Sequence, residues 1–394
     1  MPRERRLKDK RPKLAQRLRR RFPTKRAKLG VTEPQLSLPI GPHERETSAS
    51  VSLSPIVLRH LAPAKVSEVY ESYWHFAAER QSIFFRRIRG DEQPWTSNPV
   101  LAHFKFTNAY RASDRTSQYL IRHVIYREDL PHSTREVFFR IILFKLFNKI
   151  ETWDLLEKAL GQVTFEDYRF ARYDKILASA MSEGRRIYSA AYIMPPGGSA
   201  FGRSIKHQNH LMLLERMMAD HLPERLEQAN TMQEGFERLL SYPTIGDFLA
   251  YQFITDINYS LITNFSEMEF VVPGPGARDG IRKCFSDPGG LNEPELIRLV
   301  ADLQEQEFER LGLDFQSLWG RRLQLIDCQN LFCEVDKYAR VVHPQVAGRT
   351  GRTRIKQKFE AKQEPLRLFY PPKWDLNDSI NADFTASGKR RRRP

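Results

Sequence analysis

The stretch "QEGFERLLSYPTIGDFLAYQFITDINYS", residues 233–260, decides the expected fold. Apolar residues recur at helical spacing on both sides of a Pro-Thr-Ile-Gly turn, which predicts two helices, 231–241 and 246–259, joined by a tight hairpin. Gly246 suits such a turn, and exposed amides at the start of the second helix can hold a phosphate. Pro-x-Ile-Gly also occurs as ordinary turn chemistry, so both interpretations stay open.

The hairpin resembles that of helix-hairpin-helix DNA-binding proteins, which makes Thr244 and Gly246 candidate contacts to the DNA backbone. Asp256 follows in an apolar and aromatic run, where burial would raise its pKa. We take Asp256 as the candidate catalytic base, with a structural aspartate as the alternative. In DNA glycosylases of this type a catalytic aspartate follows the hairpin at a distance that corresponds here to 264–270. That region offers Glu267 and Glu269 but no aspartate, so the sequence departs from the glycosylase pattern at the acid.

Helical periodicity dominates the chain on both sides of the hairpin. Strand-like runs are scarce, and the two best, 186–194 and 268–272, are short and isolated. We therefore predict an all-α, multi-helix fold with a helix-hairpin-helix DNA-glycosylase-like core. The other expected helices are 66–89, 99–127, 133–149, 151–160, 165–182, 206–220, 277–286, 293–311 and 319–338.

Basic, Ser- and Pro-rich composition predicts a disordered arm at 1–60 and a disordered basic tail at 376–394, flanking a helical domain at 65–360. The formal net charge is +15, of which residues 1–30 carry +12 and residues 389–393 carry +5, which leaves −2 for the rest. Such arms either bind a nuclear import receptor, bind phosphate groups non-specifically, or do neither.

Because the body of the chain is nearly neutral, a DNA-binding surface on it requires a local basic patch. The best candidate is "GRTGRTRIKQKF", residues 348–359, which holds five Lys and Arg and no acidic residue. From this run we take Arg352, Arg354 and Lys356 as candidate contacts to the DNA backbone.

Several classes of site and protein are disfavoured. The three cysteines lack the paired Cys-x-x-Cys of a zinc site, and we expect no metal and can name no cofactor. No apolar stretch approaches the roughly 20 residues of a membrane span, and the N-terminus lacks the apolar region of a secretory signal. "GGSAFGRS" (197–204) has P-loop spacing without a parallel-sheet pattern, and "HQNH" (207–210) lacks a third metal ligand.

The segment "HFKFTNAYRASDRTSQYL", residues 103–120, reads as a helix with polar groups at core spacing. Asn108, Arg111, Asp114, Arg115 and Gln118 fall on one face at about 100° per residue. Arg111 and Arg115 would lie one turn apart, so an anion is expected beside them, either Asp114 or a ligand phosphate. A buried structural ion network or a solvated face is the alternative.

Three further segments add candidates for substrate or phosphate binding. The apolar helix before residue 149 ends in an asparagine, which also suits a simple helix cap. The Gly-Pro-Gly loop at 273–276 precedes a basic helix, where it can cradle phosphate or be only a flexible loop. The candidates are Asn148; Gly274, Gly276 and Lys283; and Gln329, Glu334 and Lys337.

Taken together, five stretches resemble one family, the helical domain associated with 5-hydroxymethyluracil DNA kinases. This domain is related to the alpha-glutamyl/putrescinyl thymine pyrophosphorylases of DNA hypermodification. The resemblance spans roughly 65–360, and several motifs in the same order make it more specific than any single one. The stretches are "PWTSNPVLAHFKFTNAYRASDRTSQYL", "LFKLFNKIETW", "PTIGDFLAYQFITDINYS", "FVVPGPGARDGIRKCF" and "QNLFCEVDKYAR".

The resemblance implies a DNA-glycosylase-like helical fold linked to thymine modification in DNA. A separate P-loop kinase domain is not recognised here, so we do not expect kinase activity. In the related pyrophosphorylases an amine displaces pyrophosphate from a 5-methylene group of uracil. By that resemblance Arg111, Arg115 and Lys283 would hold pyrophosphate, Asp256 would act as base, and the target base would be flipped out of the duplex.

The expected function is pyrophosphorylase-like group transfer onto a 5-(pyrophosphoryloxymethyl)uracil-type base. A non-catalytic module that recognises a modified or flipped base is one alternative, and a divergent glycosylase is another. DNA is the expected partner, with an import receptor as a further one, and no membrane is expected. The expected location is the nucleus in a eukaryote and otherwise the cytoplasm or nucleoid.

Overall fold

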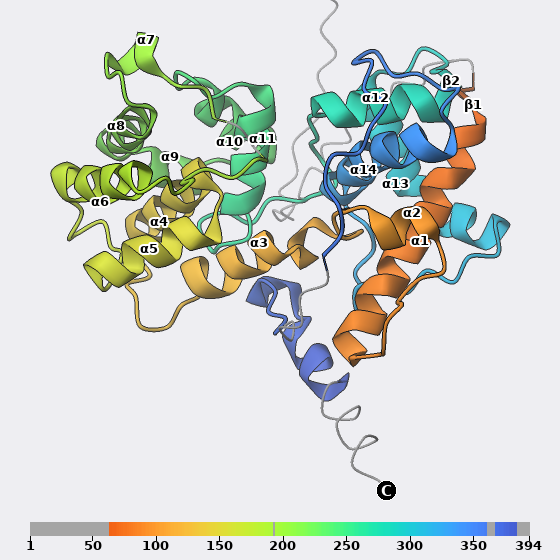
Figure 1. The fold of residues 1–394 in the computed structure, drawn as a ribbon, viewed down its shortest axis with the longest axis horizontal. Coiled ribbons are helices and arrows are strands. Elements are labelled where there is room, and N and C mark those ends of the chain that lie inside the picture. The colour runs from red at the N-terminus through yellow and green to blue at the C-terminus, as the bar shows by residue number, and fades with distance from the viewer. Residues whose placement is uncertain (1–62, 192–193, 361–366, 384–394) are drawn as a thin grey trace, which may run out of the picture. The chain divides into compact units, whose positions relative to one another are not determined.

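Two groups of helices make up the described part of the protein in the computed structural model (Figure 1). The structure describes residues 63–191, 194–360 and 367–383, which all belong to the unit Arg59–Pro394. The α4–α11 group comes from the middle of the chain: α4 (Thr134–Phe147), α5 (Ile150–Leu160), α6 (Phe170–Ser182), α7 (Gly198–Phe201), α8 (Lys206–Ala219), α9 (Leu222–Glu227), α10 (Met232–Leu240) and α11 (Asp247–Ile257).

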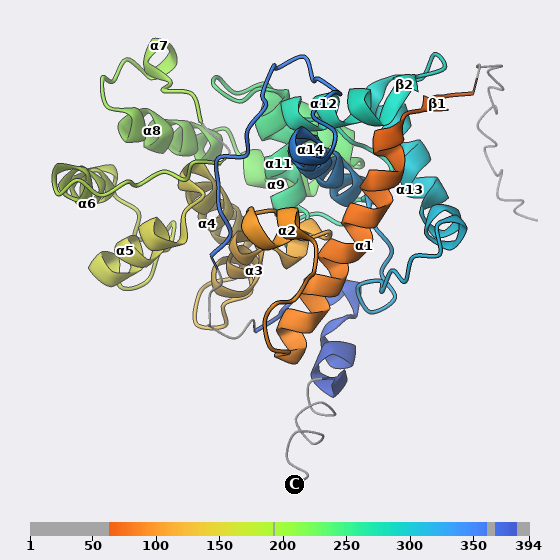
Figure 2. The same cartoon turned by 45° about the vertical axis from the view of Figure 1, so that its right-hand side comes forward.

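The second group, which we call the α1/α14 group, combines segments that precede and follow the first. Its helices α1 and α14 pack against each other and against α12 (Figure 2). Its elements are β1 (Lys65–Val66), α1 (Glu68–Arg89), α2 (Pro99–His103), α12 (Pro275–Cys284), β2 (Phe285–Asp287), α13 (Glu293–Arg310) and α14 (Leu325–Val342). The strands β1 and β2 pair antiparallel.

Short elements join the two groups. The chain passes from α2 through the 3₁₀-helix η1 (Arg111–Ser113), α3 (Arg115–Tyr119) and the π-helix η2 (Leu120–Ile125) before it enters α4. The 3₁₀-helix η3 (Pro372–Trp374) lies in the C-terminal described segment. η1 contacts α14, and η2 packs on α4, so this connection touches both groups.

Local sequence explains where the long helices begin and end. Ser67 caps α1 by accepting a hydrogen bond from the Val69 amide, and Gly90 ends α1 in the left-handed conformation. α13 starts with a capping box of Asn292 and Glu295. α4 is buried on every side from residue 136 to residue 147 and ends at Asn148, which has φ 48°, so the predicted cap is confirmed.

The segment 103–120 is not one helix, so that prediction is wrong. α2 ends at His103, because Phe104 pairs with Lys358 in an isolated β-bridge. The Asn108 side chain donates to the Ser113 carbonyl (2.7 Å), and the Asp114 carboxylate accepts from the Asn108 amide (2.8 Å). These short-range hydrogen bonds compete with helical ones and hold the chain in a turn.

The all-α prediction is confirmed, because the described residues are mostly helical. The short strand-like runs, 268–272 and the described part of 186–194, form no strand, in line with the all-α prediction. The helix expected at 319–338 begins at Leu325, after a turn at Leu318–Arg321. The predicted arm at 1–60 and residues 384–394 of the tail predicted at 376–394 lie outside the described residues. Residues 377–383 of that tail are helical, so the prediction of disorder is wrong there. In the described part of the chain, no helix is long and apolar enough to cross a membrane.

Candidate functional site

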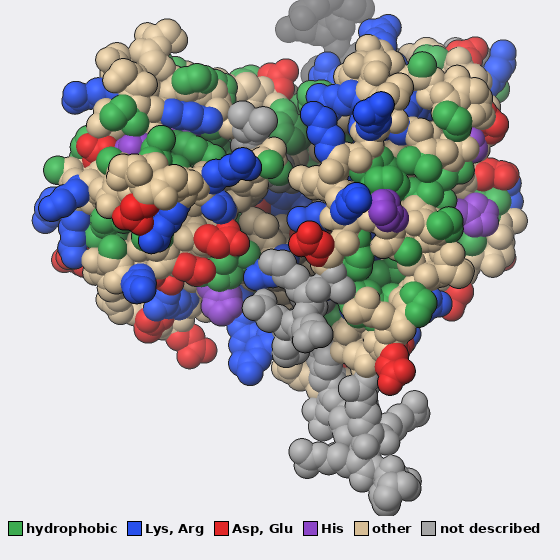
Figure 3. Space-filling view, in the orientation of Figure 1, with side chains coloured by type: hydrophobic (Ala, Val, Ile, Leu, Met, Phe, Trp, Pro, Cys, Tyr) green, Lys and Arg blue, Asp and Glu red, His purple; other side chains and the backbone are tan. Residues whose placement is uncertain are grey.

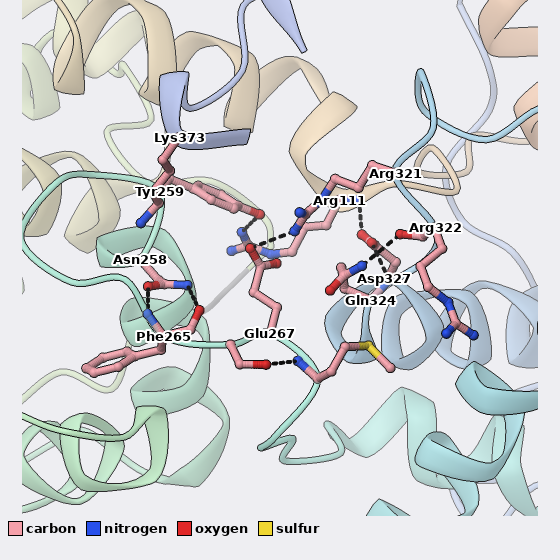
Figure 4. A network of polar contacts seen from close by, with 12 residues as sticks. Arg111, Asn258, Tyr259, Phe265, Glu267, Arg321, Arg322, Gln324, Asp327 and Lys373 are labelled. Carbon is pink, nitrogen blue, oxygen red and sulfur yellow. Dashed lines mark hydrogen bonds and ion pairs between the residues drawn. The ribbon is translucent and has the colours of Figure 1, made fainter. Parts of the chain in front are cut away.

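Arg111 forms hydrogen bonds with both helix groups at a buried polar junction. Its guanidinium Nη1 lies 2.8 Å from Asp256 Oδ1 and 2.9 Å from the Tyr259 hydroxyl, and its Nε donates to Gln252 Oε1 at 3.1 Å. Its main-chain amide donates to Asp327 Oδ1 on α14 at 2.8 Å. Figure 4 shows Arg111 between Tyr259 and Asp327. The side chain therefore holds the α4–α11 group while the backbone holds the other group.

Lys145 of α4 supplies a second cation at this junction. Its Nζ lies 3.0 Å from Asp256 Oδ2 and donates to Asn148 Oδ1 at 2.8 Å. On α14, Gln329 lies at hydrogen-bond distance from Gln252, at 3.5 Å. We call Arg111, Lys145, Gln252, Asp256, Tyr259 and Asp327 the polar seam.

The seam follows from helical spacing on α11. Gln252 and Asp256 are four residues apart and so point to the same side, and Tyr259 follows in the next turn. Both α11 residues are fully buried, in a helix whose other buried residues are mostly apolar. A buried charge is tolerated only when it is paired and hydrogen-bonded, which explains why Asp256 has two cationic partners.

Asp256 is ionised in this setting. Burial raises the pKa of Asp256, but the nearby charges of Arg111 and Lys145 outweigh burial and hold the pKa below its ordinary value. The expected raised pKa is therefore wrong, and an ion-paired carboxylate is a weak general base. Burial instead lowers the pKa of Lys145, against the opposing effect of Asp256.

Two other aspartates carry the raised pKa that the sequence predicted for Asp256. Burial raises the pKa of Asp114 to about 7, although the Asn108 amide opposes the shift. Burial likewise raises the pKa of Asp327 to about 7, against hydrogen bonds from the Gln324 and Arg111 amides. Both carboxylates flank the Arg111 turn.

The predicted polar face of 103–120 is divided by the structure. Asn108, Arg111 and Gln118 are buried, whereas Arg115 is exposed, so the two arginines do not stack. Asn108 also accepts a hydrogen bond from Arg80, at 3.0 Å. Gln118 donates to the Ala112 carbonyl at 2.8 Å and accepts from the Phe369 amide at 2.9 Å. These contacts favour the structural alternative for the buried members.

The Gly-Pro-Gly loop serves helix packing. A Cβ on Gly274 would lie 2.8 Å from the Phe248 ring, and one on Gly276 would lie 2.5 Å from Cys333 Sγ. Lys283 is buried, and its Nζ lies 3.0 Å from Asp336 Oδ1. On α14, the helix that carries Asp336, Glu334 forms an ion pair with Lys337 (2.5 Å). Glu334 also accepts a hydrogen bond from the Thr107 amide (3.1 Å). One shared pocket of Arg111, Arg115, Asp256 and this loop is therefore not supported.

The hairpin between α10 and α11 forms as predicted, but its glycine plays a different part. The left-handed conformation falls on Thr244, with φ 71°, whereas Gly246 is the extended N-cap of α11, with φ −97°. A Cβ on Gly246 would meet nothing within 4 Å, and Gly246 is exposed, so the turn is open to solvent at this residue. An open turn leaves room for a DNA backbone.

A cluster that the sequence prediction missed lies beside the seam (Figure 4). Arg321 donates to Glu267 at 2.9 Å, and its guanidinium lies 3.8 Å from the centre of the Trp374 ring. Lys373 donates to the Ser260 and Thr263 carbonyls at 3.0 and 2.6 Å, and burial lowers its pKa to about 8. The signal was the aromatic and proline-rich "FYPPKW" run, 369–374.

The P-loop-like run 197–204 does not form a phosphate-binding loop, and the run 207–210 does not form a metal site. The P-loop-like run follows a non-strand segment and contains only the one-turn helix α7. His207 lies 2.7 Å from Asp174, and His210 bonds Tyr188 and the Pro195 carbonyl. Over the described ranges, no cluster of three or more His, Cys, Asp or Glu has the arrangement of a metal site.

Comparison with known proteins identifies the domain. The family described as "5-hmdU DNA kinase, helical domain" matches residues 67–348, well over half of the chain. The chain belongs to this family. The 5-hmdU DNA kinase of Bacillus phage SP10 is 28% identical over 295 residues, which are 70% of this chain and 46% of the phage protein. The chain thus spans about half the length of that relative. No solved structure matches.

The boundaries of the 5-hmdU DNA kinase helical domain place the features above in two classes. The whole polar seam and the α10–α11 hairpin lie inside the match, so they belong to the family domain. The basic run after residue 348 lies outside it, as do Lys373 and Trp374.

Proposed function

We propose that this chain acts in the hypermodification of thymine in DNA. The family of residues 67–348 and the name of the phage relative, a 5-hmdU DNA kinase, support this proposal. DNA is then the partner, and the hairpin turn at Thr244 and Gly246 is the proposed contact with the DNA backbone.

The finer proposal is pyrophosphorylase-like group transfer onto a 5-(pyrophosphoryloxymethyl)uracil-type base. An amine nitrogen attacks the 5-methylene carbon, the bond from that carbon to the pyrophosphate oxygen breaks, and pyrophosphate leaves with the bonding electrons. The amine loses one proton. Cations that hold the leaving group stabilise this step, and Arg115, which is exposed, is the candidate for this role. The absence of kinase activity stays a prediction.

Asp256 has a different role from the one predicted. Its two carboxylate oxygens lie against Arg111 and Lys145 at 2.8 and 3.0 Å, and it is fully buried. We assign it the role of a positioning residue that keeps the two cations oriented. The proton of the amine then goes to another group or to solvent.

A second candidate function is a non-catalytic module that recognises a modified or flipped base. The observation that favours it is that the buried candidate groups are already paired: Asp256 with two cations, Lys283 with Asp336, and Glu334 with Lys337. A module of this kind needs a rigid scaffold and a binding surface but no free base or nucleophile.

Mass spectrometry of nucleosides separates these candidates. A duplex with one 5-(pyrophosphoryloxymethyl)uracil is incubated with the protein and putrescine, digested and analysed. A nucleoside with the amine in place of pyrophosphate supports group transfer. Duplex binding without conversion contradicts group transfer and leaves the module, whereas release of free base indicates a glycosylase.

Arg115→Ala tests the accessible cation in the same assay. We expect turnover to fall about tenfold or more, as for the loss of one charge-stabilising group. Arg172→Ala is the matched control, because Arg172 is an exposed arginine on α6. Equal turnover in both variants would contradict the role of Arg115.

The basic runs near the two ends of the chain support a proposal on where the protein is located in the cell. If the chain is eukaryotic, we propose nuclear import through the basic runs at 1–30 and 389–393. Deletion of both runs from a fluorescent fusion should then abolish nuclear accumulation, whereas unchanged accumulation would contradict it.

A further inference from the structure

A basic segment outside the family match is held on the surface of the α1/α14 group. We call residues 349–358 the basic strap. Arg352, Arg354, Lys356 and Lys358 are all exposed, and Ile355 between them is half-buried. Together with Arg349 they give five cations in a run without an acidic residue. In Figure 1 the strap follows the edge of the α1/α14 group that faces the α4–α11 group.

One end of the strap is fixed by Asp279 of α12. Asp279 Oδ1 accepts a hydrogen bond from the Arg349 amide at 3.1 Å, and Oδ2 accepts from the Thr350 amide and hydroxyl at 3.2 and 2.6 Å. Burial raises the pKa of Asp279, but these hydrogen bonds and Arg282 outweigh it and hold the pKa below its ordinary value. The carboxylate is therefore ionised and accepts three hydrogen bonds from this end of the strap.

The middle and the far end of the strap are fixed as well. The Arg340 guanidinium donates to the Arg354 carbonyl at 3.2 Å. The Lys105 amide donates to the Gln357 carbonyl at 3.0 Å, and the Phe359 amide donates to the His103 carbonyl at 2.9 Å. These contacts use the backbone of the strap, so its charged side chains stay directed to solvent.

This arrangement has a physical consequence. Five like charges on a fixed backbone repel one another, and the attachments prevent the segment from spreading to relieve that repulsion. Exposed Lys105 adds a further cation beside the strap. In Figure 3, Lys and Arg side chains gather along the hollow between the two helix groups. A polyanion with regularly spaced charges is the partner that relieves such repulsion.

We propose that the basic strap binds the phosphate backbone of double-stranded DNA, beside the hollow between the two helix groups. The proposal rests on the proposed function, because that function makes DNA the substrate. It adds a second, sequence-independent contact with DNA outside the matched residues 67–348. Contacts of this kind position a duplex without reading its bases.

Protection of lysines from acetylation tests the strap at its own positions. The full-length protein is acetylated briefly with and without a duplex, and modification at each lysine is quantified by mass spectrometry. Lys356 and Lys358 should be protected about fivefold or more at saturating DNA, because phosphate contacts bury the amines. Exposed Lys158 and Lys175 on α5 and α6 are internal controls and should not change.

Unchanged reactivity of Lys356 and Lys358 under saturating duplex would overturn the proposal. Equal protection by polyglutamate at the same charge concentration would also overturn it, since the strap would then be a site for acidic peptides. The readout is specific to position, so the basic runs at 1–30 and 389–393 do not obscure it.

A matched pair of triple variants gives a second measurement. Arg352→Ala, Arg354→Ala and Lys356→Ala together should make the slope of log Kobs against log salt shallower by up to about 2.7, at about 0.9 for each phosphate contact. Lys158→Ala, Arg172→Ala and Lys175→Ala remove the same charge from exposed positions and should leave the slope near that of the wild type.

The outcomes separate the strap from the proposed function. An unchanged salt slope in the strap variant, together with normal conversion or normal binding of a modified duplex, overturns the strap alone. If the wild-type protein shows no preference for the modified base over thymine, the proposed function is overturned, whatever the result for the strap.

Discussion

Asp256 is the residue on which the interpretation of the seam depends. A fully buried carboxylate between an arginine and a lysine is a structural group, because its removal leaves two buried cations without compensation. The same contacts that make it important for stability make it a poor base. The domain thus has a charge network at the aspartate that the sequence analysis took as the candidate catalytic base.

Asp256→Asn should destabilise the protein by about 3–5 kcal/mol, as for breaking a buried ion pair. Urea unfolding followed by circular dichroism measures this change. Glu183→Gln, which breaks an exposed pair with Arg185, is the control and should change stability by less than about 1 kcal/mol. Similar stability of the two variants would show that the seam does not hold the groups together.

Asp114, which accepts a hydrogen bond from the Asn108 amide, gives the stability of the protein a dependence on pH. Its pKa in the folded protein is about 7, above the ordinary value, so the folded state retains a proton that the unfolded state loses between about pH 4 and 7. The contribution of Asp114 to wild-type stability should therefore fall as pH rises through this window. Asp114→Asn keeps an acceptor for the Asn108 amide and removes the titration.

The stability of Asp114→Asn relative to the wild type should consequently increase from pH 5 to pH 7 and then level off. Denaturant titrations at half-unit steps of pH measure it. A constant difference across the window would mean that Asp114 does not retain its proton.

At the scale of elements, α12 crosses α14 closely at Gly280. A Cβ on Gly280 would lie 2.0 Å from the Phe332 carbonyl oxygen, so only glycine permits this crossing. Glycine-to-alanine changes within helices normally stabilise by about 1 kcal/mol. Gly280→Ala should instead destabilise by about 1–3 kcal/mol or more through overpacking.

Thermal unfolding of Gly280→Ala tests this packing. Gly246→Ala is the control, because a Cβ there meets nothing within 4 Å and its φ is not left-handed. An unchanged or higher Tm for Gly280→Ala would contradict the close crossing, whereas a large loss in Gly246→Ala would show that the hairpin is less open than described.

The sequence predicted most long elements well because their periodicity and caps are local. The helices from α4 to α13 lie close to their expected ranges, apart from the one- and two-turn helices α7 and α9. The segment 103–120 failed, because its polar residues bond their own backbone and distant partners rather than a helix face. Helical spacing alone does not carry that information.

At the scale of the whole chain, residues far apart in sequence meet at the seam. Arg111, Lys145, Asp256 and Asp327 come from four separate segments. The sequence identified Arg111 and Asp256 as important but not their pairing, and it missed Lys145 because a lysine in an apolar run has no distinctive local pattern. Lys373 and Trp374 were missed because their partners, Ser260 and Arg321, lie far away in the sequence.

Both proposed functions share one claim, that the protein distinguishes a modified thymine in DNA. The most direct test is the affinity for a duplex with one 5-(pyrophosphoryloxymethyl)uracil against the same duplex with thymine, at about 150 mM salt to limit non-specific binding. We predict a Kd at least about tenfold lower for the modified duplex, which corresponds to about 1.4 kcal/mol. Equal Kd values for the two duplexes would contradict the account.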